Sequence, residues 1–596
     1  MQTPRADLWM LIVTLALTLA GCDDDASSKN NVNNVNNTNN VNNTNNTNNV
    51  VNPQLVRVDV TPALSALQAQ ETVALTATGV FDDDSTRDVT AEAAWSSDAT
   101  SVATVDASGL VMAVAVGAAT ITATVGGLHG TASVEVLPEL ADPVHDREFR
   151  AAWVATVWGI NFPSSTSSVS AQQTQLVGIL DALAAHGFNA VVFQVRPEGD
   201  AFYASTLEPW SRFLTGTMGQ EPGWDPLDYL VTEAHARGIE VHAWFNPYRA
   251  LVSRTVSATS NHVSRRFPEY AYPWGPSLLW MDPGAAVVRD HIIDVVMDVA
   301  LRYDVDGVHF DDYFYPWPAD GYTFPDEPLY QAYLSGGGAL GKADWRRDNV
   351  NQMIRLIGEE LAATVPHVRF GVGPFGIWKA GEPPGVTGTS QYDVLFSDPK
   401  KWIQEGWVDY IAPQLYWPTT STGQPYQPLL TWWAGLADDR YIFAGNALYR
   451  LGDNASWTVD EFRQQVQIGR NLRAQGVLGN VFYHVGNIVS DRSGVASMFH
   501  EEFYALPALT PPVMAAVADV PAWPRVTVAG DQITVTHPEP AAVRAWVVYV
   551  DAGGAWGVHR IVPAAESTFT LPAGRWAISA ASLGNVESRA VVITVE

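Results

Sequence analysis

Residues 307–313 have the sequence Gly-Val-His-Phe-Asp-Asp-Tyr, which predicts a short strand that ends in two acidic residues. Because successive side chains of a strand point to opposite faces, His309 and Asp311 share one face, and Val308 and Phe310 share the other. One face is therefore polar near the end of the strand, and the other is apolar. A polar strand end of this kind indicates a site rather than a purely structural strand.

Seven other segments have a similar strand character and alternate with amphipathic helical stretches. The other strand candidates are 150–158, 190–196, 240–246, 369–375, 410–417, 442–449 and 481–485, and helical segments follow most of them, for example 171–185, 226–237, 285–303, 345–364 and 459–474. Eight strand–helix units are the number that a (β/α)8 TIM barrel needs. A doubly wound open sheet is the competing fold, but no Gly-x-Gly-x-x-Gly follows the first strand, which disfavours its dinucleotide-binding version. We therefore predict a TIM barrel over residues 146–507.

Two regions of β-type alternation flank the predicted barrel. Residues 53–138 alternate between apolar and polar side chains, with Gly and Asp clusters between the runs, and residues 510–596 return to this pattern. Each region predicts a β-sandwich. The expected fold class is thus a multidomain chain with a central (β/α)8 TIM barrel flanked by two all-β sandwich domains, which suits a length of 596 residues.

The N-terminal segment carries the features of a bacterial lipoprotein signal. Arg5 precedes a largely apolar run, and Leu19-Ala20-Gly21-Cys22 follows, which resembles the lipobox whose cysteine becomes the acylated first residue of the mature chain. We expect residues 1–21 to be the signal peptide and residues 22–52, rich in Asn, to be a disordered tether. The protein is accordingly expected in the bacterial cell envelope, attached to a membrane through a lipid on Cys22, at the outer membrane or cell surface rather than in the cytoplasm.

Removing the attachment site should release the protein from the membrane. A Cys22→Ser variant is expected to partition into the aqueous phase of a detergent extraction, because several acyl chains hold a mature lipoprotein and this variant carries none. Partition is measured for parent and variant side by side. If the variant stays with the membrane as tightly as the parent, the apolar run is an uncleaved anchor instead.

Charge and cysteine content argue against several classes of partner and site. The chain has 63 acidic and 34 basic residues and a formal net charge of −29. Such a chain repels phosphate backbones, so nucleic acid is not an expected partner. Its single cysteine allows no intrachain disulfide and no cysteine-based metal site.

Polar side chains also gather near the ends of other predicted strands. They share a strand face in three groups, which are Gln194 with Arg196, His242 with Trp244 and Asn246, and Gln414 with Tyr416. Burial of polar groups costs free energy unless they are paired, and chemistry in a TIM barrel sits at the carboxyl ends of the strands. The pattern predicts a site at that face of the barrel.

Acidic residues near the strand ends are the candidates for catalysis. Asp311 and Asp312 follow the fourth strand, and Glu198 and Asp200 come just after the second. Paired carboxylates suit glycoside hydrolysis, since one protonates the leaving oxygen and the other attacks or activates water. The alternative for Asp311 and Asp312 is a helix cap or a salt bridge to a nearby arginine.

The sequence predicts no metal and no cofactor. His242, His309 and His484 occur singly on different predicted strands, and a lone barrel histidine is more often a hydrogen-bonding group than a metal ligand. Nothing in the sequence resembles a serine nucleophile elbow or a phosphate-binding loop.

Several stretches of the barrel region carry recognisable motifs, and in order along the chain they are 150–157, 193–197, 199–201, 242–249, 306–316, 376–378, 402–407 and 409–417. Together they resemble the glycosyl-hydrolase-like 10 family of bacterial envelope lipoproteins. The resemblance implies a TIM-barrel glycosidase, with family members linked to cleavage of peptidoglycan glycan strands. It also implies that Asp200, rather than Glu198, is the acid of the second strand loop.

The flanking regions have resemblances of their own. Residues 53–138 resemble a bacterial Ig-like domain of group 2, through Trp95-Ser96-Ser97, Val102-Ala103-Thr104-Val105-Asp106 and Gly109-Leu110-Val111. Residues 510–596 are similar to a fibronectin type III-like module.

These observations predict a glycoside hydrolase that acts on a cell-envelope or extracellular glycan, such as peptidoglycan glycan strands. We expect Asp311 to be the nucleophile or base and Asp312 or Asp200 to be the proton donor. The expected sugar-binding residues are Gln194, Arg196, Trp244, Asn246, Tyr248, Arg249, His309, Tyr313, Trp378, Gln414, Tyr416 and Trp417. The alternative is a non-catalytic surface protein that binds carbohydrate or acts as an adhesin, because a fold does not fix a function.

Overall fold

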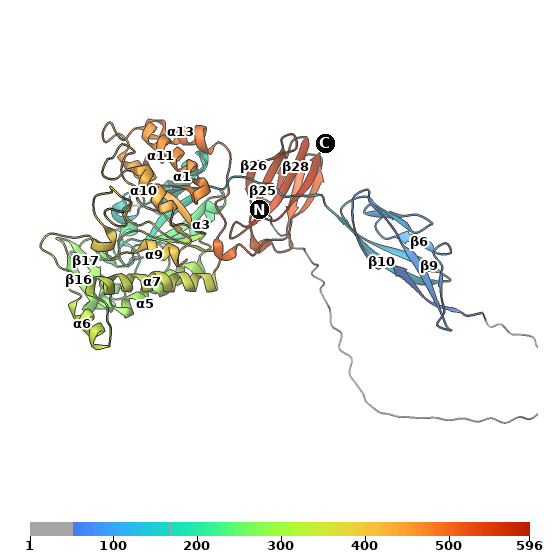
Figure 1. Cartoon of the computed structure of the whole chain (residues 1–596), viewed down its shortest axis with the longest axis horizontal. Coiled ribbons are helices and arrows are strands. Elements are labelled where there is room, and N and C mark those ends of the chain that lie inside the picture. The colour runs from blue at the N-terminus through green and yellow to red at the C-terminus, as the bar shows by residue number, and fades with distance from the viewer. Residues whose placement is uncertain (1–51, 167) are drawn as a thin grey trace, which may run out of the picture.

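The structure, a computed structural model, describes residues 52–166 and 168–596 (Figure 1). It confirms the predicted fold class, with a central barrel, β-sheets before it and an antiparallel β domain after it. Figure 1 shows the C-terminal β domain between the barrel and the N-terminal β domain. The signal peptide, Cys22 and the Asn-rich segment up to residue 51 lie outside the described residues, so the predictions made for them stay predictions.

The barrel is closed by eight parallel strands. In order around the barrel they are β12 (Phe149–Val154), β13 (Ala190–Arg196), β14 (Glu240–Phe245), β18 (Gly307–Phe310), β19 (Arg369–Val372), β20 (Tyr410–Ile411), β21 (Tyr441–Asn446) and β22 (Val477–Phe482). Strand order follows chain order, and β22 pairs in parallel with β12 to close the ring. All eight strands thus direct their carboxyl ends to the same face.

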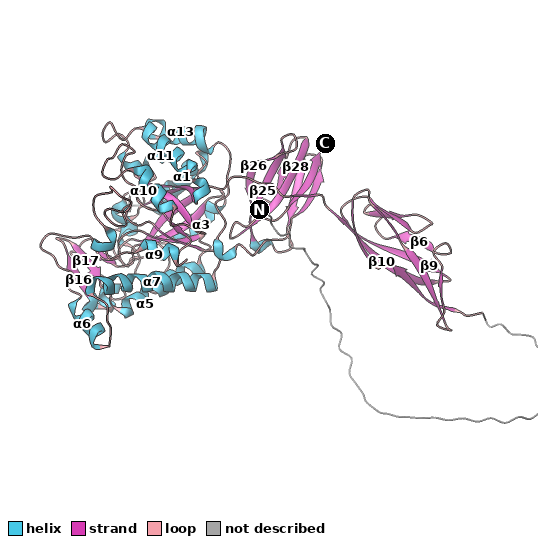
Figure 2. Ribbon diagram, viewed as in Figure 1, coloured by secondary structure: helices cyan, strands magenta, loops and turns pink. Residues whose placement is uncertain are grey.

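Helices surround the barrel, most of them in the connections between its strands and two of them, α12 and α13, after the last strand (Figure 2). The main ones are α1 (Val169–Ala185), α3 (Pro226–His235), α5 (Ala286–Arg302), α7 (Lys342–Thr364), α10 (Tyr426–Ala434) and α11 (Val459–Asn471). The shorter ones are α2 (Arg212–Thr215), α4 (Val263–Arg266), α6 (Glu327–Ser335), α8 (Gln391–Val394), α9 (Pro399–Gln404), α12 (Gly486–Val489) and α13 (Val495–Phe499). None of the helices in the described residues combines the length and apolar character that crossing a membrane requires.

Local sequence signals explain where several helices begin. Ser168 caps α1 and Asp225 caps α3, where each side chain accepts hydrogen bonds from backbone N–H groups of the first turn. Pro226 occupies the first position of α3, where its missing N–H costs nothing. Thr458 caps α11 by accepting from the N–H of Glu461, the Thr-x-x-Glu spacing of a capping box.

Two apolar layers hold the barrel together. One lies between the strands and the helices, and the other fills the barrel interior with side chains such as Phe149, Val192, Trp244, Tyr410 and Phe443. The interior is therefore a packed core and not a pore.

Some barrel strands are shorter than the sequence predicts. The segment predicted as a strand at 410–417 forms only the two-residue β20, because Pro413 has no N–H to donate to a sheet. A three-stranded antiparallel sheet that the sequence pattern did not predict is inserted after β14. It consists of β15 (Arg249–Leu251), β16 (Ala271–Trp274) and β17 (Leu278–Met281).

The N-terminal domain consists of three small sheets around an apolar core. Its strands are β1 (Leu55–Thr61), β2 (Leu64–Gln68), β3 (Thr72–Ala74), β4 (Thr76–Phe81), β5 (Thr86–Asp88), β6 (Ala94–Ser97), β7 (Ala103–Val105), β8 (Leu110–Ala113), β9 (Gly117–Val125) and β10 (Leu128–Leu137). Alternate residues of β9 and β10 are buried, for example Ile121 and Val134, which fits a sheet with one face on the core.

The C-terminal domain consists of two antiparallel sheets. Its own strands are β23 (Arg525–Ala529), β24 (Gln532–Thr536), β25 (Val543–Asp551), β26 (Trp556–Pro563), β27 (Thr568–Thr570), β28 (Gly574–Ser582) and β29 (Ala590–Val595). Their facing sides enclose a core that includes Ile533, Trp546 and Trp576.

The segment between the N-terminal domain and the barrel is attached to the C-terminal domain. Its strand β11 (Leu140–Ala141) pairs antiparallel with β29 and becomes the edge strand of that sheet. Further along the segment, His145 and Arg147 each lie 2.8 Å from the carboxylate of Glu587. The chain therefore contacts the C-terminal domain before it enters the first barrel strand.

Candidate active site

A cavity of about 280 Å³ opens at the carboxyl ends of the barrel strands. Most of its lining is aromatic, and among the described residues that line it the acidic ones are the two predicted at the end of β18. The lining residues are Trp153, Val157, Trp158, Ile160, Gln194, Trp244, Arg249, Asp311, Asp312, Tyr313, Trp317, Phe375, Gln414, Tyr416, Tyr449 and Tyr483. Polar groups at this face of a TIM barrel are the expected location of chemistry.

Asp311 and Asp312 are held by hydrogen bonds in almost complete burial, at 6% and 5% exposure. Asp311 Oδ2 accepts from Asn246 Nδ2 at 2.6 Å. Asp312 accepts from Gln414 Nε2 at 3.2 Å through Oδ1 and from Trp317 Nε1 at 3.1 Å through Oδ2. Neither carboxylate forms an ion pair with a described basic side chain within 4.0 Å, so the salt-bridge alternative for the pair does not hold.

This environment shifts the proton affinity of both acids. Burial raises the pKa of Asp311, and the charge of Asp312 raises it further, to about 7. Burial also raises the pKa of Asp312, although the N–H groups of Gln414 and Trp317 oppose that shift. Two close carboxylates that titrate together retain a proton near neutral pH, which is the condition for a general acid.

Hydrogen bonds between the side-chain amides of Gln194 and Asn246 orient Asp311. Gln194 Oε1 accepts from the backbone N–H groups of Thr156 and Val157 at 2.8 and 2.9 Å, so the Gln194 amide must direct its Nε2 to Asn246 Oδ1. With its oxygen occupied in this way, Asn246 must direct its Nδ2 to Asp311. The amide group of Asn246 therefore favours a defined orientation of the acid.

Eight of the residues predicted for the site line the cavity. They are Asp311, Asp312, Gln194, Trp244, Arg249, Tyr313, Gln414 and Tyr416. The Arg249 guanidinium lies 5.2 Å from the centre of the Tyr313 ring. These residues come from β13, β14 and β15, and from the segments that follow β18 and β20.

The other seven predicted site residues lie outside the cavity lining. They are Asp200, Arg196, Asn246, Tyr248, His309, Trp378 and Trp417. Asp200 is fully buried and accepts from the Glu198 N–H at 2.9 Å, and burial followed by the charge of Glu198 raises its pKa to about 7. Its role as proton donor stays a prediction, and its place away from the cavity does not support it.

Arg196 is fully buried in a salt bridge and does not reach the cavity. Its Nε and Nη2 atoms donate to Glu208 at 2.7 and 2.5 Å, and its Nη1 donates to the carbonyl oxygens of Asn246 and Pro247. Arg196 thus stabilises the backbone just after β14 through these hydrogen bonds. Trp378 likewise uses its indole N–H on Asp398 at 3.0 Å, away from the cavity.

Trp153 was absent from the predicted set of sugar-binding residues, and so were five other aromatic residues of the lining. They are Trp158, Trp317, Phe375, Tyr449 and Tyr483. Trp158, Tyr449 and Tyr483 lie at or just beyond the ends of β12, β21 and β22, so the strand-end rule applied to the Asp pair could have found them. Trp317 lies in a loop, where the sequence gives no such signal.

Trp158 is the most exposed aromatic residue of the lining. Its side chain is 62% exposed, and its backbone has φ 56° and ψ 12°, in the left-handed region that a bulky residue rarely adopts. Such a conformation costs on the order of 1 kcal/mol or more and is concentrated at functional sites. A large exposed ring held at the mouth of the cavity is suited to stacking on a sugar ring.

The described residues contain no cluster of three or more His, Cys, Asp or Glu side chains placed to hold a metal ion.

Comparison with known proteins places this site in a family. Residues 148–459 match the glycosyl hydrolase-like 10 family, and residues 56–136 match the bacterial Ig-like domain of group 2. The chain is 38% identical to glycosyl hydrolase YngK of Bacillus subtilis over 64% of its length and 76% of that protein. It is also 38% identical to glycosyl hydrolase DigH of Escherichia coli K12, over 51% of its length and 74% of that protein.

Among solved structures, the chain is similar to the glycoside hydrolase domain of PgaB from Bordetella bronchiseptica. The TM-score is 0.42 at 13% identity, over 60% of this chain and 98% of that domain. The family match covers more than half of the chain. It includes the cavity residues from Trp153 to Tyr449, whereas Tyr483 lies beyond it. Through its barrel, the chain belongs to the glycosyl hydrolase-like 10 family.

Proposed function

We propose that this protein is a glycoside hydrolase that cleaves a cell-envelope or extracellular glycan, with peptidoglycan glycan strands as the first substrate to test. The observation that carries the proposal is the buried Asp311–Asp312 pair in an aromatic cavity at the carboxyl face of the barrel. The family membership and the names of YngK and DigH support the same class of reaction.

The pair supplies the proton that the reaction needs. Asp311, with its pKa near 7, donates the proton to the glycosidic oxygen as the bond from that oxygen to the anomeric carbon breaks. The Asp312 carboxylate keeps its negative charge through the N–H groups of Gln414 and Trp317 and stabilises the positive charge that develops on the sugar. Water then adds to the anomeric carbon, and its proton returns to the pair. This assignment makes Asp311 the donor, whereas the sequence alone favoured it as nucleophile or base.

The decisive experiment incubates the purified protein with peptidoglycan glycan strands, with and without their stem peptides. New reducing ends that appear with the parent protein and not with a boiled sample support hydrolysis. Saturable binding without new reducing ends would instead support the non-catalytic carbohydrate-binding alternative, which the two flanking β domains and the exposed Trp158 favour.

Replacing Trp158 with Ala should weaken the use of long substrates. A cavity of about 280 Å³ lies near the lower end of the usual range for ligand pockets, so part of a long glycan must lie outside it, where Trp158 is exposed. We expect KM for long strands to rise about tenfold with little change in kcat, because a stacking ring binds ground state and transition state alike.

The control for this variant is Trp523→Ala. Trp523 is also exposed, at 42%, but lies near the C-terminal domain and far along the chain from the cavity. Equal effects of both substitutions on KM, or no effect of Trp158→Ala, would remove Trp158 from the binding surface.

A further inference from the structure

A chain of buried hydrogen bonds runs along the barrel interior from the catalytic cavity to the opposite end. Trp153 Nε1 lies 3.2 Å from His309 Nε2, and His309 Nδ1 lies 3.0 Å from the hydroxyl of Tyr410. The same hydroxyl lies 2.9 Å from His242 Nδ1, and His242 Nε2 lies 3.3 Å from Glu240 Oε2. Trp153 lines the cavity, whereas Glu240 is the first residue of β14, at the amino end of the barrel.

The chemistry of the groups fixes one direction for the whole chain. An indole N–H can only donate, so His309 Nε2 accepts and His309 carries its proton on Nδ1, which donates to Tyr410. Burial lowers the pKa of His309 well below its usual range, which keeps this ring neutral. The single hydroxyl proton of Tyr410 must then go to His242 Nδ1, and His242 Nε2–H donates to Glu240.

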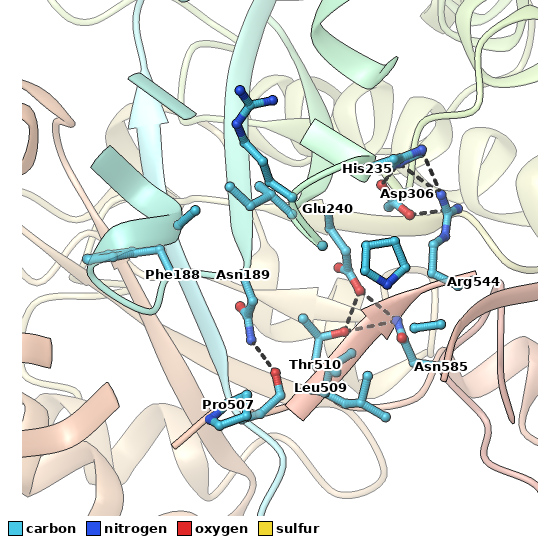
Figure 3. Close-up of a pocket in the computed structure, with 18 of the residues that line it drawn as sticks. Phe188, Asn189, His235, Glu240, Asp306, Pro507, Leu509, Thr510, Arg544 and Asn585 are labelled. Carbon is cyan, nitrogen blue, oxygen red and sulfur yellow. Dashed lines mark hydrogen bonds and ion pairs between the residues drawn. The ribbon is translucent and has the colours of Figure 1, made fainter. Parts of the chain in front are cut away.

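The acceptor end of the chain is held by Thr510 and Asn585, which lie outside the barrel strands, and by Arg369 of β19 (Figure 3). Glu240 Oε1 accepts from Asn585 Nδ2 at 2.6 Å and from the hydroxyl of Thr510, as the dashed lines in Figure 3 show. Arg369 Nη2 lies 3.6 Å from the same oxygen and donates to Thr510. Burial raises the pKa of Glu240, but the charge of Arg369 and the hydrogen bond from His242 outweigh that effect and lower the pKa, so the Glu240 carboxylate stays charged.

Asn585 belongs to the C-terminal domain, in the loop between β28 and β29. It borders a cavity of about 190 Å³ between that domain and the amino end of the barrel. In the same cavity Arg544 of β25 lies 2.8 Å from Asp306, just before β18, which fixes the two domains against each other. The C-terminal domain thus supplies a hydrogen-bond donor to the end of a chain whose other end lies in the catalytic cavity.

We propose that Glu240, Tyr410 and Asn585 are positioning residues, which act through the hydrogen-bond chain to hold the Trp153 indole in place against the sugar. This role rests on the proposed function. It makes the C-terminal domain a part of the catalytic unit rather than an appended module.

The test is a double-mutant cycle on kcat/KM for peptidoglycan glycan strands, measured on the full protein. Tyr410→Phe removes only the hydroxyl, which leaves two buried histidine nitrogens without partners, and should lower kcat/KM about tenfold. Trp153→Phe removes the end of the chain. In the Trp153→Phe background, Tyr410→Phe should lower kcat/KM less than about twofold, because a residue that acts through Trp153 has nothing left to position.

Asn585→Ala tests the link between the domains in the same way. It should lower kcat/KM about threefold alone and leave it nearly unchanged in the Trp153→Phe background. Tyr504→Phe is the matched control, because the Tyr504 hydroxyl is also buried but has no hydrogen-bond partner among the described residues. It should leave kcat/KM unchanged.

Three results would overturn the positioning role while the parent hydrolyses the strands. These are additive effects in the cycle, no effect of Tyr410→Phe, and no effect of Asn585→Ala. If the parent shows no hydrolysis, the proposed function fails, and the same cycle on Kd for the strands decides the positioning role. Additive losses of affinity, or no binding at all, then overturn it.

Discussion

Substituting Asp311 with Asn is expected to lower kcat/KM for glycan hydrolysis by about 10³-fold without unfolding the protein. The substitution keeps the shape of the side chain and an oxygen that can accept from Asn246, but it removes the proton that the leaving oxygen needs. Initial rates of reducing-end formation measure the effect, and circular dichroism checks the fold. If the variant keeps most of its activity, Asp311 is not the donor.

The pH dependence of the parent provides an independent check. Because the acid must be protonated, kcat/KM should be highest below the pKa of Asp311, about 7, and should fall as the pH rises through it. Asp312→Asn removes a neighbouring negative charge, so it should lower the pKa of Asp311 and move this decline to lower pH. Asp282→Asn is the matched control, since burial also raises the pKa of Asp282 to about 7 but Asp282 lies outside the cavity lining.

Replacing Glu208 with Ala is expected to destabilise the barrel by about 3–5 kcal/mol. Glu208 and Arg196 are both fully buried, and the carboxylate also lies 3.1 Å from His291 Nε2. The variant leaves the Arg196 charge in the protein interior without its counter-ion, whereas an unfolded chain would solvate it. Thermal and urea unfolding of parent and variant measure the loss.

The matched control is Glu359→Ala. Glu359 pairs with Arg355 one helical turn away on α7, and both side chains are exposed, so this variant should lose about 0.5 kcal/mol or less. Burial would raise the pKa of Glu208, but Arg196 and His291 outweigh it and lower the pKa to about 2. The ion pair therefore stabilises the fold above about pH 4.5, and the difference between parent and Glu208→Ala should shrink as the pH falls towards 2. A loss equal to that of the surface control would contradict this account.

The fold and the centre of the site follow from local patterns in the sequence. Alternation of buried strands with amphipathic helices predicts the barrel, and strand parity places Gln194, Trp244 and the acids after β18 at one face. The fold prediction is confirmed because the period of the side chains and the order of the elements are local properties of the sequence, and closing the barrel brings the strand ends together.

The predictions that did not lead to the cavity depend on contacts between distant segments. Arg196 is on the same strand face as Gln194, but its side chain forms a buried ion pair with Glu208 of the following loop and does not reach the cavity. His309 has the parity of Asp311, but it lies one step deeper and binds Tyr410, which is 101 residues away. Trp317 donates a hydrogen bond to Asp312 from a loop, and the conformation of that loop cannot be predicted from a periodic pattern in the sequence. Hydrogen-bond and ion-pair partners of this kind are determined by tertiary packing, and the periodicity of a strand carries no information about them.

The attachment of the segment around β11 to the C-terminal domain determines how mechanical load would pass through the molecule. A pull on the N-terminal domain passes to the barrel through the connecting segment, which meets β29 at Leu140–Ala141 and Glu587 at His145 and Arg147 before it reaches Phe149. Tension is thus transferred to the C-terminal sheet first. The first barrel strand, whose end carries Trp153, is shielded from it as long as those contacts hold.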